Sequence, residues 1–240
     1  AAPRDDASRD ARTRQEAGGQ GQRSSSHRMT GLFITLEGGD GAGKSTHSGL
    51  LENWLNSLGR QVVRTREPGG TDLGADIREL VLHRKGHMDA RAEALLYAAD
   101  RAQHIATVVR PALERGDIVV QDRYLDSSIA YQGTGRELGA DEVRDLSLWA
   151  ARGLLPDLTV LFDLDPEEGR RRIGETRGTY DRLEAESKSF HDSVRAAFLA
   201  LAAADPDRFL VIDATQPREH VAELIRTRVA ELLERQPAGE

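Results

Sequence analysis

The residues best suited to chemistry form one short run that combines glycines with a lysine and a hydroxyl. The run consists of Gly38, Gly39, Asp40, Gly41, Ala42, Gly43, Lys44 and Ser45, followed by Thr46. Glycines allow a backbone to curl so tightly that successive N–H groups face one anion. Lys44 adds a cation for phosphate oxygens, and Ser45 adds a hydroxyl ligand for Mg²⁺. The run therefore predicts a phosphate-binding loop (P-loop) for a nucleoside triphosphate.

The segments around this run have the patterns that a P-loop needs. An apolar strand is predicted over 32–37 before it, and a helix over 46–58 after it. Longer helical patterns alternate with four further predicted strands, at 61–65, 118–122, 158–164 and 209–213. This alternation is typical of an α/β fold, so we predict a five-stranded parallel sheet with helices on both faces.

Composition excludes several other kinds of protein. The chain has 240 residues, no cysteine and a net charge of −7, so we expect no disulfide and no nucleic-acid polymer as partner. No stretch approaches the roughly 20 apolar residues of a membrane span, and we expect a cytoplasmic protein without membrane contact. Residues 1–28 are polar and lack apolar periodicity, which predicts a disordered extension before a folded domain at 29–236.

A P-loop indicates the phosphate donor but leaves the acceptor unknown. Four further segments carry chemistry-bearing residues, and they lie at 66–70, 97–101, 122–124 and 127–133. Three of them follow predicted strands, and one lies on a predicted helix. Because the carboxyl ends of parallel strands meet at one edge of a sheet, we expect these segments to form the acceptor site there.

A fifth segment is predicted to be a lid, at about 168–183. Its helical pattern begins at 166–168, runs into three arginines at 170–172, and is interrupted by glycines at 174 and 178. Solvated arginines on a helix face are the ordinary explanation for such a cluster. Beside a P-loop, the cluster favours a mobile basic flap, since phosphoryl transfer needs cations over the migrating group.

The order and spacing of these segments resemble the thymidylate kinase family over residues 30–235. The shared motifs are Glu-Gly-x-Asp-Gly-x-Gly-Lys-Ser, Arg-Glu-Pro-Gly-Gly, Asp-Arg-Tyr, Ser-x-x-Tyr-Gln-Gly and Asp-Arg-x-Glu. The resemblance implies the fold of P-loop nucleoside monophosphate kinases and a kinase that transfers phosphate from ATP to dTMP in dTTP synthesis. It also implies Mg²⁺ as cofactor and a homodimer. The helix predicted at 90–106 is a candidate dimer face, although its apolar stripe would equally serve a core.

The resemblance implies a role for each acceptor residue. Its acceptor set comprises Arg66, Pro68, Arg78, Tyr97, Arg101, Arg123, Ser128, Tyr131 and Gln132. Tyr97 would stack on the thymine ring, the pair 128 and 132 would hydrogen-bond the base edge, and the arginines at 78, 101 and 123 would hold the acceptor phosphate. Tyr131 would exclude a 2′-hydroxyl. Each position taken alone also fits an ordinary core tyrosine, turn cap or surface arginine.

The implied catalytic residues are Lys44, Asp40, Arg123 and Arg177. Some family members carry an arginine in the P-loop directly after its acid, but Gly41 occupies that position here. The resemblance is therefore to the bacterial type whose catalytic arginine lies in the lid, with Arg177 as first choice and Arg172 as second. Ser45 and Asp122 are the predicted metal ligands, although a capping or arginine-pairing role for Asp122 remains open.

Two alternatives also remain open. One is a P-loop kinase that acts on another nucleoside monophosphate or on a deoxynucleoside. The other is a module that binds a nucleotide without transferring its phosphate. A panel of acceptors separates these alternatives from a kinase for dTMP.

Overall fold

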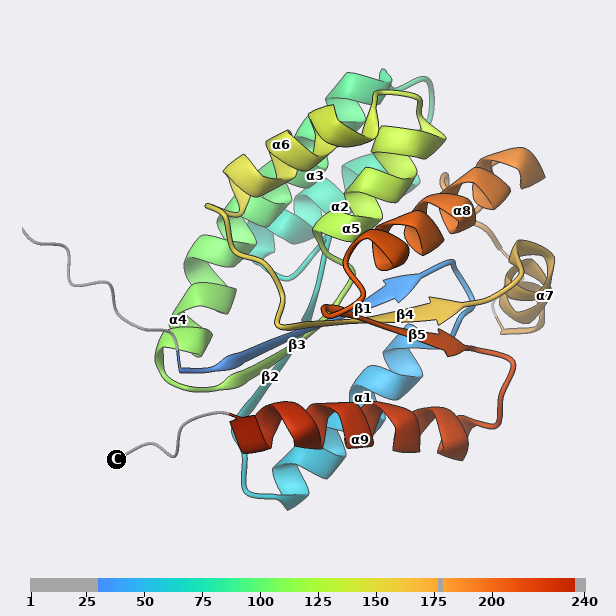
Figure 1. Ribbon diagram of the computed structural model, residues 1–240. Coiled ribbons are helices and arrows are strands. Elements are labelled where there is room, and N and C mark those ends of the chain that lie inside the picture. The colour runs from blue at the N-terminus through green and yellow to red at the C-terminus, as the bar shows by residue number, and fades with distance from the viewer. Residues whose placement is uncertain (1–29, 177–178, 236–240) are drawn as a thin grey trace, which may run out of the picture.

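The predicted strands form a single parallel sheet in the computed structural model of the chain, which describes residues 30–176 and 179–235 (Figure 1). The strands are β1 (Leu32–Gly38), β2 (Val62–Arg66), β3 (Ile118–Asp122), β4 (Leu158–Asp163) and β5 (Phe209–Asp213). Their order is β2-β3-β1-β4-β5, and every neighbouring pair is parallel. The predicted fold class is therefore confirmed. The predicted extension 1–28 and Arg177 lie outside the described residues.

Helices cover both faces of the sheet (Figure 1). One face carries α1 (Lys44–Ser57) and α9 (Arg218–Arg235). The other face carries α2 (Asp72–His83), α3 (Ala90–His104), α5 (Leu125–Ser128), α6 (Ala140–Ala150) and α8 (Lys188–Ala204). Two wider, π-helical segments extend them: η1 (Ile105–Val109) joins α3 to α4 (Arg110–Glu114), and η2 (Ile129–Gly135) continues α5. The strand β1 is buried at every position, as double coverage requires.

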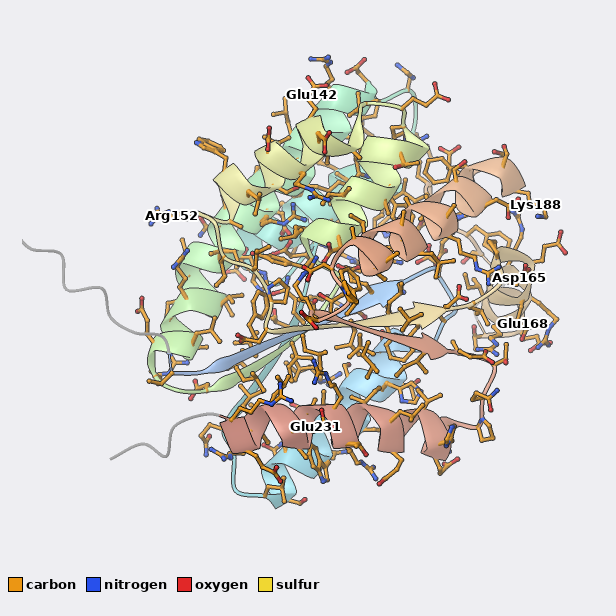
Figure 2. All side chains as sticks on the ribbon, in the orientation of Figure 1. Glu142, Arg152, Asp165, Glu168, Lys188 and Glu231 are labelled. Carbon is orange, nitrogen blue, oxygen red and sulfur yellow. The ribbon has the colours of Figure 1, made fainter. Side chains whose placement is uncertain are left out.

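Alternating side chains of the strands feed two separate cores. Phe33, Val119 and Leu161 pack with the helices of the α3 face, whereas their neighbours Ile34 and Val120 pack with α1 and α9. Side chains fill both layers in Figure 2, while Glu142 and Glu231 lie at the surface. Within the described part of the chain, no helix is both long and apolar enough to cross a membrane.

The P-loop lies at the middle of the carboxyl edge, because β1 runs between β3 and β4. The helix α7 (Pro166–Thr176) follows β4 and packs directly on this loop. A Cβ atom added to Gly41 would lie 2.4 Å from the carbonyl oxygen of Gly169, and one added to Gly169 would lie 2.4 Å from that of Asp40. Two facing glycines therefore permit α7 to approach the P-loop closely.

The prediction that Gly174 interrupts the lid helix is wrong. The helix α7 continues through this residue to Thr176. A glycine inside a helix costs only about 1 kcal/mol relative to alanine. Ion pairs one turn apart on the same helix, Arg171 with Glu175 and Arg172 with Glu168, offset part of that cost.

Candidate active site

The P-loop has the curled backbone that an anion cradle needs. Gly38, Gly41 and Gly43 have φ angles of 130°, 76° and 96°, which are accessible mainly to glycine. The Nζ of Lys44 donates hydrogen bonds to the carbonyl oxygens of Gly38 at 3.0 Å and Gly39 at 2.7 Å. Burial lowers the pKa of Lys44 to about 8, and the nearby cation of Arg123 acts in the same direction. The loop thus curls around a buried amine.

A hydroxyl and a carboxylate meet directly beside this loop. The Oγ of Ser45 donates to Oδ2 of Asp122 at 2.8 Å, because β1 and β3 are neighbours and Leu36 is paired with Asp122. Both are hard oxygen ligands of the kind that Mg²⁺ prefers. No cluster of three or more His, Cys, Asp or Glu suited to a metal occurs among the residues described. Mg²⁺ does not need one, since it takes few protein ligands and completes its shell with phosphate oxygens and water.

One cleft of about 700 Å³ joins the P-loop to the predicted acceptor residues. The predicted acceptor residues that line it are Arg66, Pro68, Arg78, Tyr97, Arg101, Arg123, Ser128, Tyr131 and Gln132, which is the complete set. Asp122 and the P-loop residues Asp40, Gly41, Gly43, Lys44, Ser45 and Thr46 line it as well. Gly38 and Gly39 instead line an adjacent, mostly apolar cavity, and the Ala42 side chain is buried. The four acceptor segments therefore converge at the sheet edge, as predicted.

Arg123 lies between the P-loop side of the cleft and the side lined by the predicted acceptor residues. Its Nη1 donates to the Gly38 carbonyl oxygen at 3.1 Å and to Ser127 Oγ at 3.0 Å. Its Nη2 donates to Asp40 Oδ1 at 2.5 Å and to the Tyr131 hydroxyl at 3.3 Å. The backbone of Arg123 has a φ of 66°, a left-handed conformation that is costly for a side-chain-bearing residue.

Asp40 and Tyr131 complete this junction. The Tyr131 hydroxyl donates to Asp40 Oδ2 at 3.0 Å, and the guanidinium of Arg123 lies 5.1 Å from the centre of the Tyr131 ring. Burial disfavours the charge on Asp40, but the cations of Arg123 and Lys44 outweigh it and lower its pKa to about 2. The carboxylate is therefore ionised at neutral pH, and it fixes both Arg123 and Tyr131.

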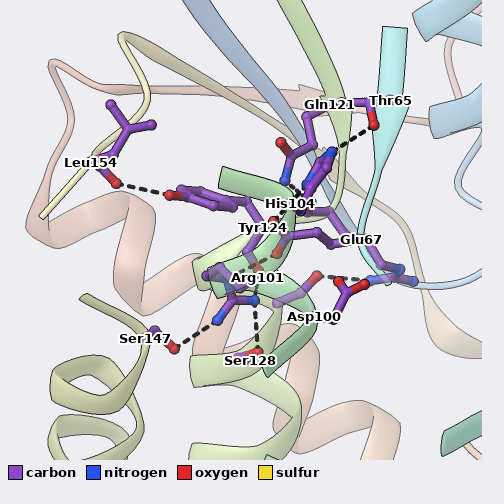
Figure 3. Close-up of polar contacts among 12 residues, drawn as sticks. Thr65, Glu67, Asp100, Arg101, His104, Gln121, Tyr124, Ser128, Ser147 and Leu154 are labelled. Carbon is purple, nitrogen blue, oxygen red and sulfur yellow. Dashed lines mark hydrogen bonds and ion pairs between the residues drawn. The ribbon is translucent and has the colours of Figure 1, made fainter. Parts of the chain in front are cut away.

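Arg101 lines the cleft and is at the same time buried among polar side chains. Its side chain is 2% exposed, and Figure 3 shows it inside a network of polar side chains. Nε donates to Glu67, Nη1 to Ser147, and Nη2 to both Ser128 Oγ and the Tyr124 carbonyl oxygen. These bonds make Arg101 a support for Ser128, while its contact with an acceptor phosphate stays a prediction.

Two arginines, Arg66 and Arg78, give the acceptor side of the cleft a positive charge. Nη1 of Arg78 donates to the carbonyl oxygen of Pro68 at 3.0 Å. Burial lowers the pKa of Arg78, and the neighbouring cation Arg66 lowers it further. Both side chains line the cleft. Such a pair of cations suits a phosphate oxygen cluster.

The arginines of α7 separate into different environments. Arg171 pairs with Glu168 and Glu175 on the exposed face, as the ordinary explanation for the cluster predicts. Arg172 lines the cleft, and its Nε donates to Glu168 Oε1 at 2.8 Å. Arg177, the predicted catalytic arginine, lies outside the described residues.

Sequence reasoning assigned no role to three buried glutamates at the cleft, of which Glu67 lines it and the other two lie behind it. Glu37 accepts hydrogen bonds from the backbone N–H groups of Tyr124 and Ser127, and from the Ser127 hydroxyl. Burial raises the pKa of Glu37 to about 7, and the negative charge of Asp126 adds to that shift. Glu67 accepts from Arg101 Nε at 2.9 Å and lies 3.0 Å from His104 Nδ1 (Figure 3).

The third glutamate, Glu93, accepts from Gln132, Arg136 and Arg182. A sequence signal for it was available. Glu93, Tyr97 and Arg101 follow one another at intervals of four residues, so they share one face of α3.

A parallel sheet, a P-loop at its central strand and an acceptor pocket across Arg123 define a P-loop nucleoside monophosphate kinase. The sequence pattern that defines thymidylate kinases matches residues 36–225. The chain belongs to the thymidylate kinase family.

Relatives named thymidylate kinase agree with this assignment. The chain is 71% identical over 199 residues to the protein of Leifsonia xyli, an alignment that covers 83% of this chain and 94% of that protein. It is 65% identical to the protein of Clavibacter michiganensis, over 85% of this chain and 97% of the relative. Identity to the protein of Bifidobacterium longum is 53%, over 85% and 100% of the two chains.

Proposed function

We propose that this chain transfers the γ-phosphoryl group of ATP to the phosphate of dTMP, giving dTDP and ADP, inside the cleft described above. The observation that carries the proposal is Arg123, which contacts the P-loop at Gly38 and the acceptor pocket at Tyr131. A cation that touches both halves is suited to hold the acceptor phosphate in line with the phosphate to be transferred.

On the donor side, the P-loop backbone holds the ATP phosphates and Lys44 neutralises their charge. ATP phosphate oxygens would replace the carbonyl oxygens of Gly38 and Gly39 as partners of the lysine Nζ. Mg²⁺, when bound with ATP, supplies positive charge at the phosphates. Ser45 and Asp122 are the residues that would hold it, a proposal supported by their position beside the P-loop. Asp40 positions Arg123 through the ion pair that joins them.

On the acceptor side, Tyr97 stacks on thymine while Ser128 and Gln132 hydrogen-bond its edge. Tyr97 is almost fully buried on α3 and lines the cleft, which supports a flat contact surface for a base. Arg78, Arg101 and Arg123 hold the phosphate of dTMP, and Arg66 lines the cleft beside Arg78. Tyr131 closes the sugar site against a 2′-hydroxyl, and its ring is held by edge contacts with Phe190 and Phe198.

The transfer itself asks mainly for positioning and charge neutralisation, since its transition state is loose. We propose Arg177 as the cation that reaches the migrating group, with Arg172 as second choice. Arg172 lies on α7 and lines the same cleft as the P-loop residues, which supports its place as second choice.

We further propose that the protein works as a homodimer in the cytoplasm. Leu95 on α3 is 58% exposed and Trp149 on the adjacent α6 is 79% exposed. Large apolar side chains so exposed favour a protein interface over a solvated face. Light scattering would give twice the mass of one chain, whereas the mass of a single chain would contradict the dimer.

Product analysis tests the activity. The protein is incubated with ATP, Mg²⁺ and dTMP, and the nucleotides are separated by chromatography. Equal amounts of dTDP and ADP are expected. Release of ADP and free phosphate with dTMP unchanged would contradict transfer, and unchanged ATP would indicate a binding module.

A further inference from the structure

Glu93 is a fully buried carboxylate that lies outside the reacting groups. It has no solvent exposure, and three side chains donate to it. Gln132 Nε2 donates to Oε1 at 2.8 Å, Arg136 Nε donates to the same oxygen at 3.4 Å, and Arg182 Nη2 donates to Oε2. The two arginines compensate the buried negative charge, which would otherwise be strongly unfavourable.

This contact determines which way the amide of Gln132 faces. A carboxylate flanked by two guanidinium groups only accepts hydrogen bonds, so the amide must turn its NH₂ group toward Glu93. Gln132 is 1% exposed and lines the cleft. Its Nε2 is held by Glu93, and its Oε1 lies at the opposite side of the same amide. The acceptor end of the amide is therefore the end available to a base.

The two pyrimidine edges differ in the group that would meet this oxygen. Thymine and uracil carry a donor at N3 and an acceptor at O4, which match the Oε1 and the second N–H of Gln132. Cytosine carries an acceptor at N3 and donors at N4, so both contacts become repulsive. Cytosine would fit only if the amide turned over, which would direct Oε1 at the Glu93 carboxylate.

We propose that Glu93 is a specificity-determining positioning residue that locks Gln132 in the orientation that accepts thymine and rejects cytosine. This inference rests on the proposed function, in which Gln132 contacts the base. In this inference, a carboxylate that touches no substrate determines the discrimination between thymine and cytosine. A site that leaves a buried polar group unpaired against the wrong ligand discriminates strongly.

The test is Glu93→Gln, because a carboxamide can either donate or accept and so permits both orientations of Gln132. We compare kcat/KM for dTMP, dUMP and dCMP in the wild-type chain, in Glu93→Gln and in the control Glu142→Gln. Glu142 is an exposed glutamate at the outer surface of α6 (Figure 2), with a side chain that is 63% exposed. The expected result is a fall of about tenfold or more in the dTMP to dCMP ratio of Glu93→Gln. Its dTMP to dUMP ratio stays unchanged, since uracil and thymine share the same edge.

A purely structural role for Glu93 would lower activity on all three acceptors together. An unchanged dTMP to dCMP ratio in folded Glu93→Gln would overturn the inference. If Glu93→Gln does not fold, Gln132→Leu takes its place: it leaves the glutamate with both arginines, and it should lose most of the discrimination against dCMP. Wild-type discrimination in Gln132→Leu would overturn the inference equally. A wild-type chain that does not phosphorylate dTMP would instead contradict the proposed function.

Discussion

The donor and acceptor halves of the cleft are built in opposite ways. The proposed donor half is one continuous stretch, 38–46, whose backbone curls around the amine of its single lysine. The acceptor half gathers side chains from α2, α3, the end of β3 and η2. These side chains are held from behind by Glu37, Glu67 and Glu93, all of which are buried.

This difference separates catalytic power from substrate choice. A backbone cradle binds any triphosphate and carries no information about the acceptor. Side chains held in fixed orientations by buried charges can distinguish one base from another. Substitutions in the donor half should therefore lower the rate of phosphoryl transfer to every acceptor by the same factor. Substitutions in the acceptor half should change the preference between acceptors.

The largest expected effect comes from breaking the donor half with Lys44→Ala. Removal of a preorganised cation from a buried site should lower kcat by about 10²- to 10³-fold. The loss should be equal for dTMP and dUMP, as judged by initial rates of ADP release. Lys188→Ala is the control, since that lysine is 56% exposed and pairs with Asp192. Wild-type turnover in Lys44→Ala would refute the role of the P-loop.

A substitution in the lid should lower the rate of transfer, as a substitution in the donor half does. Arg177→Ala should lower kcat by about 10²-fold with little change in dTMP affinity, because a cation engaged mainly in the transition state affects that step alone. Arg171→Ala is the matched control, because its guanidinium is paired on the exposed face of α7. Steady-state kinetics and calorimetric dTMP titration separate the two parameters. A loss confined to dTMP affinity would make Arg177 a substrate ligand instead.

In the acceptor half, Glu67→Gln should reduce stability and dTMP binding together. Arg101 would remain buried beside a neutral partner, and a broken buried ion pair costs about 3 to 5 kcal/mol. Urea unfolding measures the loss, with Glu142→Gln as the exposed control. Retention of wild-type stability and of the wild-type KM for dTMP would show that the network in Figure 3 does not support the pocket.

The smallest effect expected is a pH dependence at Asp100, behind the same pocket. Burial raises its pKa to about 6, and the charge of Glu67 adds to the shift; its Oδ2 has no hydrogen-bond partner within the described residues. A raised pKa favours the protonated form in the folded state, so this contribution to stability is present below about pH 4 and lost as the pH rises through about 6.

Asp100→Asn removes that dependence. The variant should therefore gain stability relative to the wild type between pH 4 and pH 7, by on the order of 1 to 3 kcal/mol. Urea unfolding at each pH measures the difference, and Asp145→Asn on the exposed face of α6 is the control. A stability difference that stays constant across this range would contradict the shifted pKa.

The same contrast explains how much could be predicted from the sequence. The P-loop was predictable because its function depends on neighbouring residues and on the strand and helix beside it. The cleft residues Tyr97, Ser128 and Gln132 were predictable from motif order, since parallel strands bring their following loops to one edge.

The parts that were missed depend on contacts between distant segments. Glu93 pairs with Arg182, which lies 89 residues away in the sequence, and no local sequence pattern indicates that partner. The bonds that bury Arg101 were missed as well, because its partners Glu67, Ser147 and Ser128 come from three separate segments. Its contact with the acceptor phosphate stays a prediction. Gly174 was expected to interrupt a helix because the ion pairs that offset its cost were not considered.

The most direct test of the central claim is ADP release with ATP, Mg²⁺ and each of dTMP, dUMP, ribose TMP, AMP, CMP and GMP. The two-part site predicts strong turnover with dTMP, weaker turnover with dUMP, and little with the ribonucleotides, because Tyr131 closes the sugar site. Strong turnover with AMP, CMP or GMP would leave the P-loop in place but contradict the roles of Tyr97, Ser128, Tyr131 and Gln132.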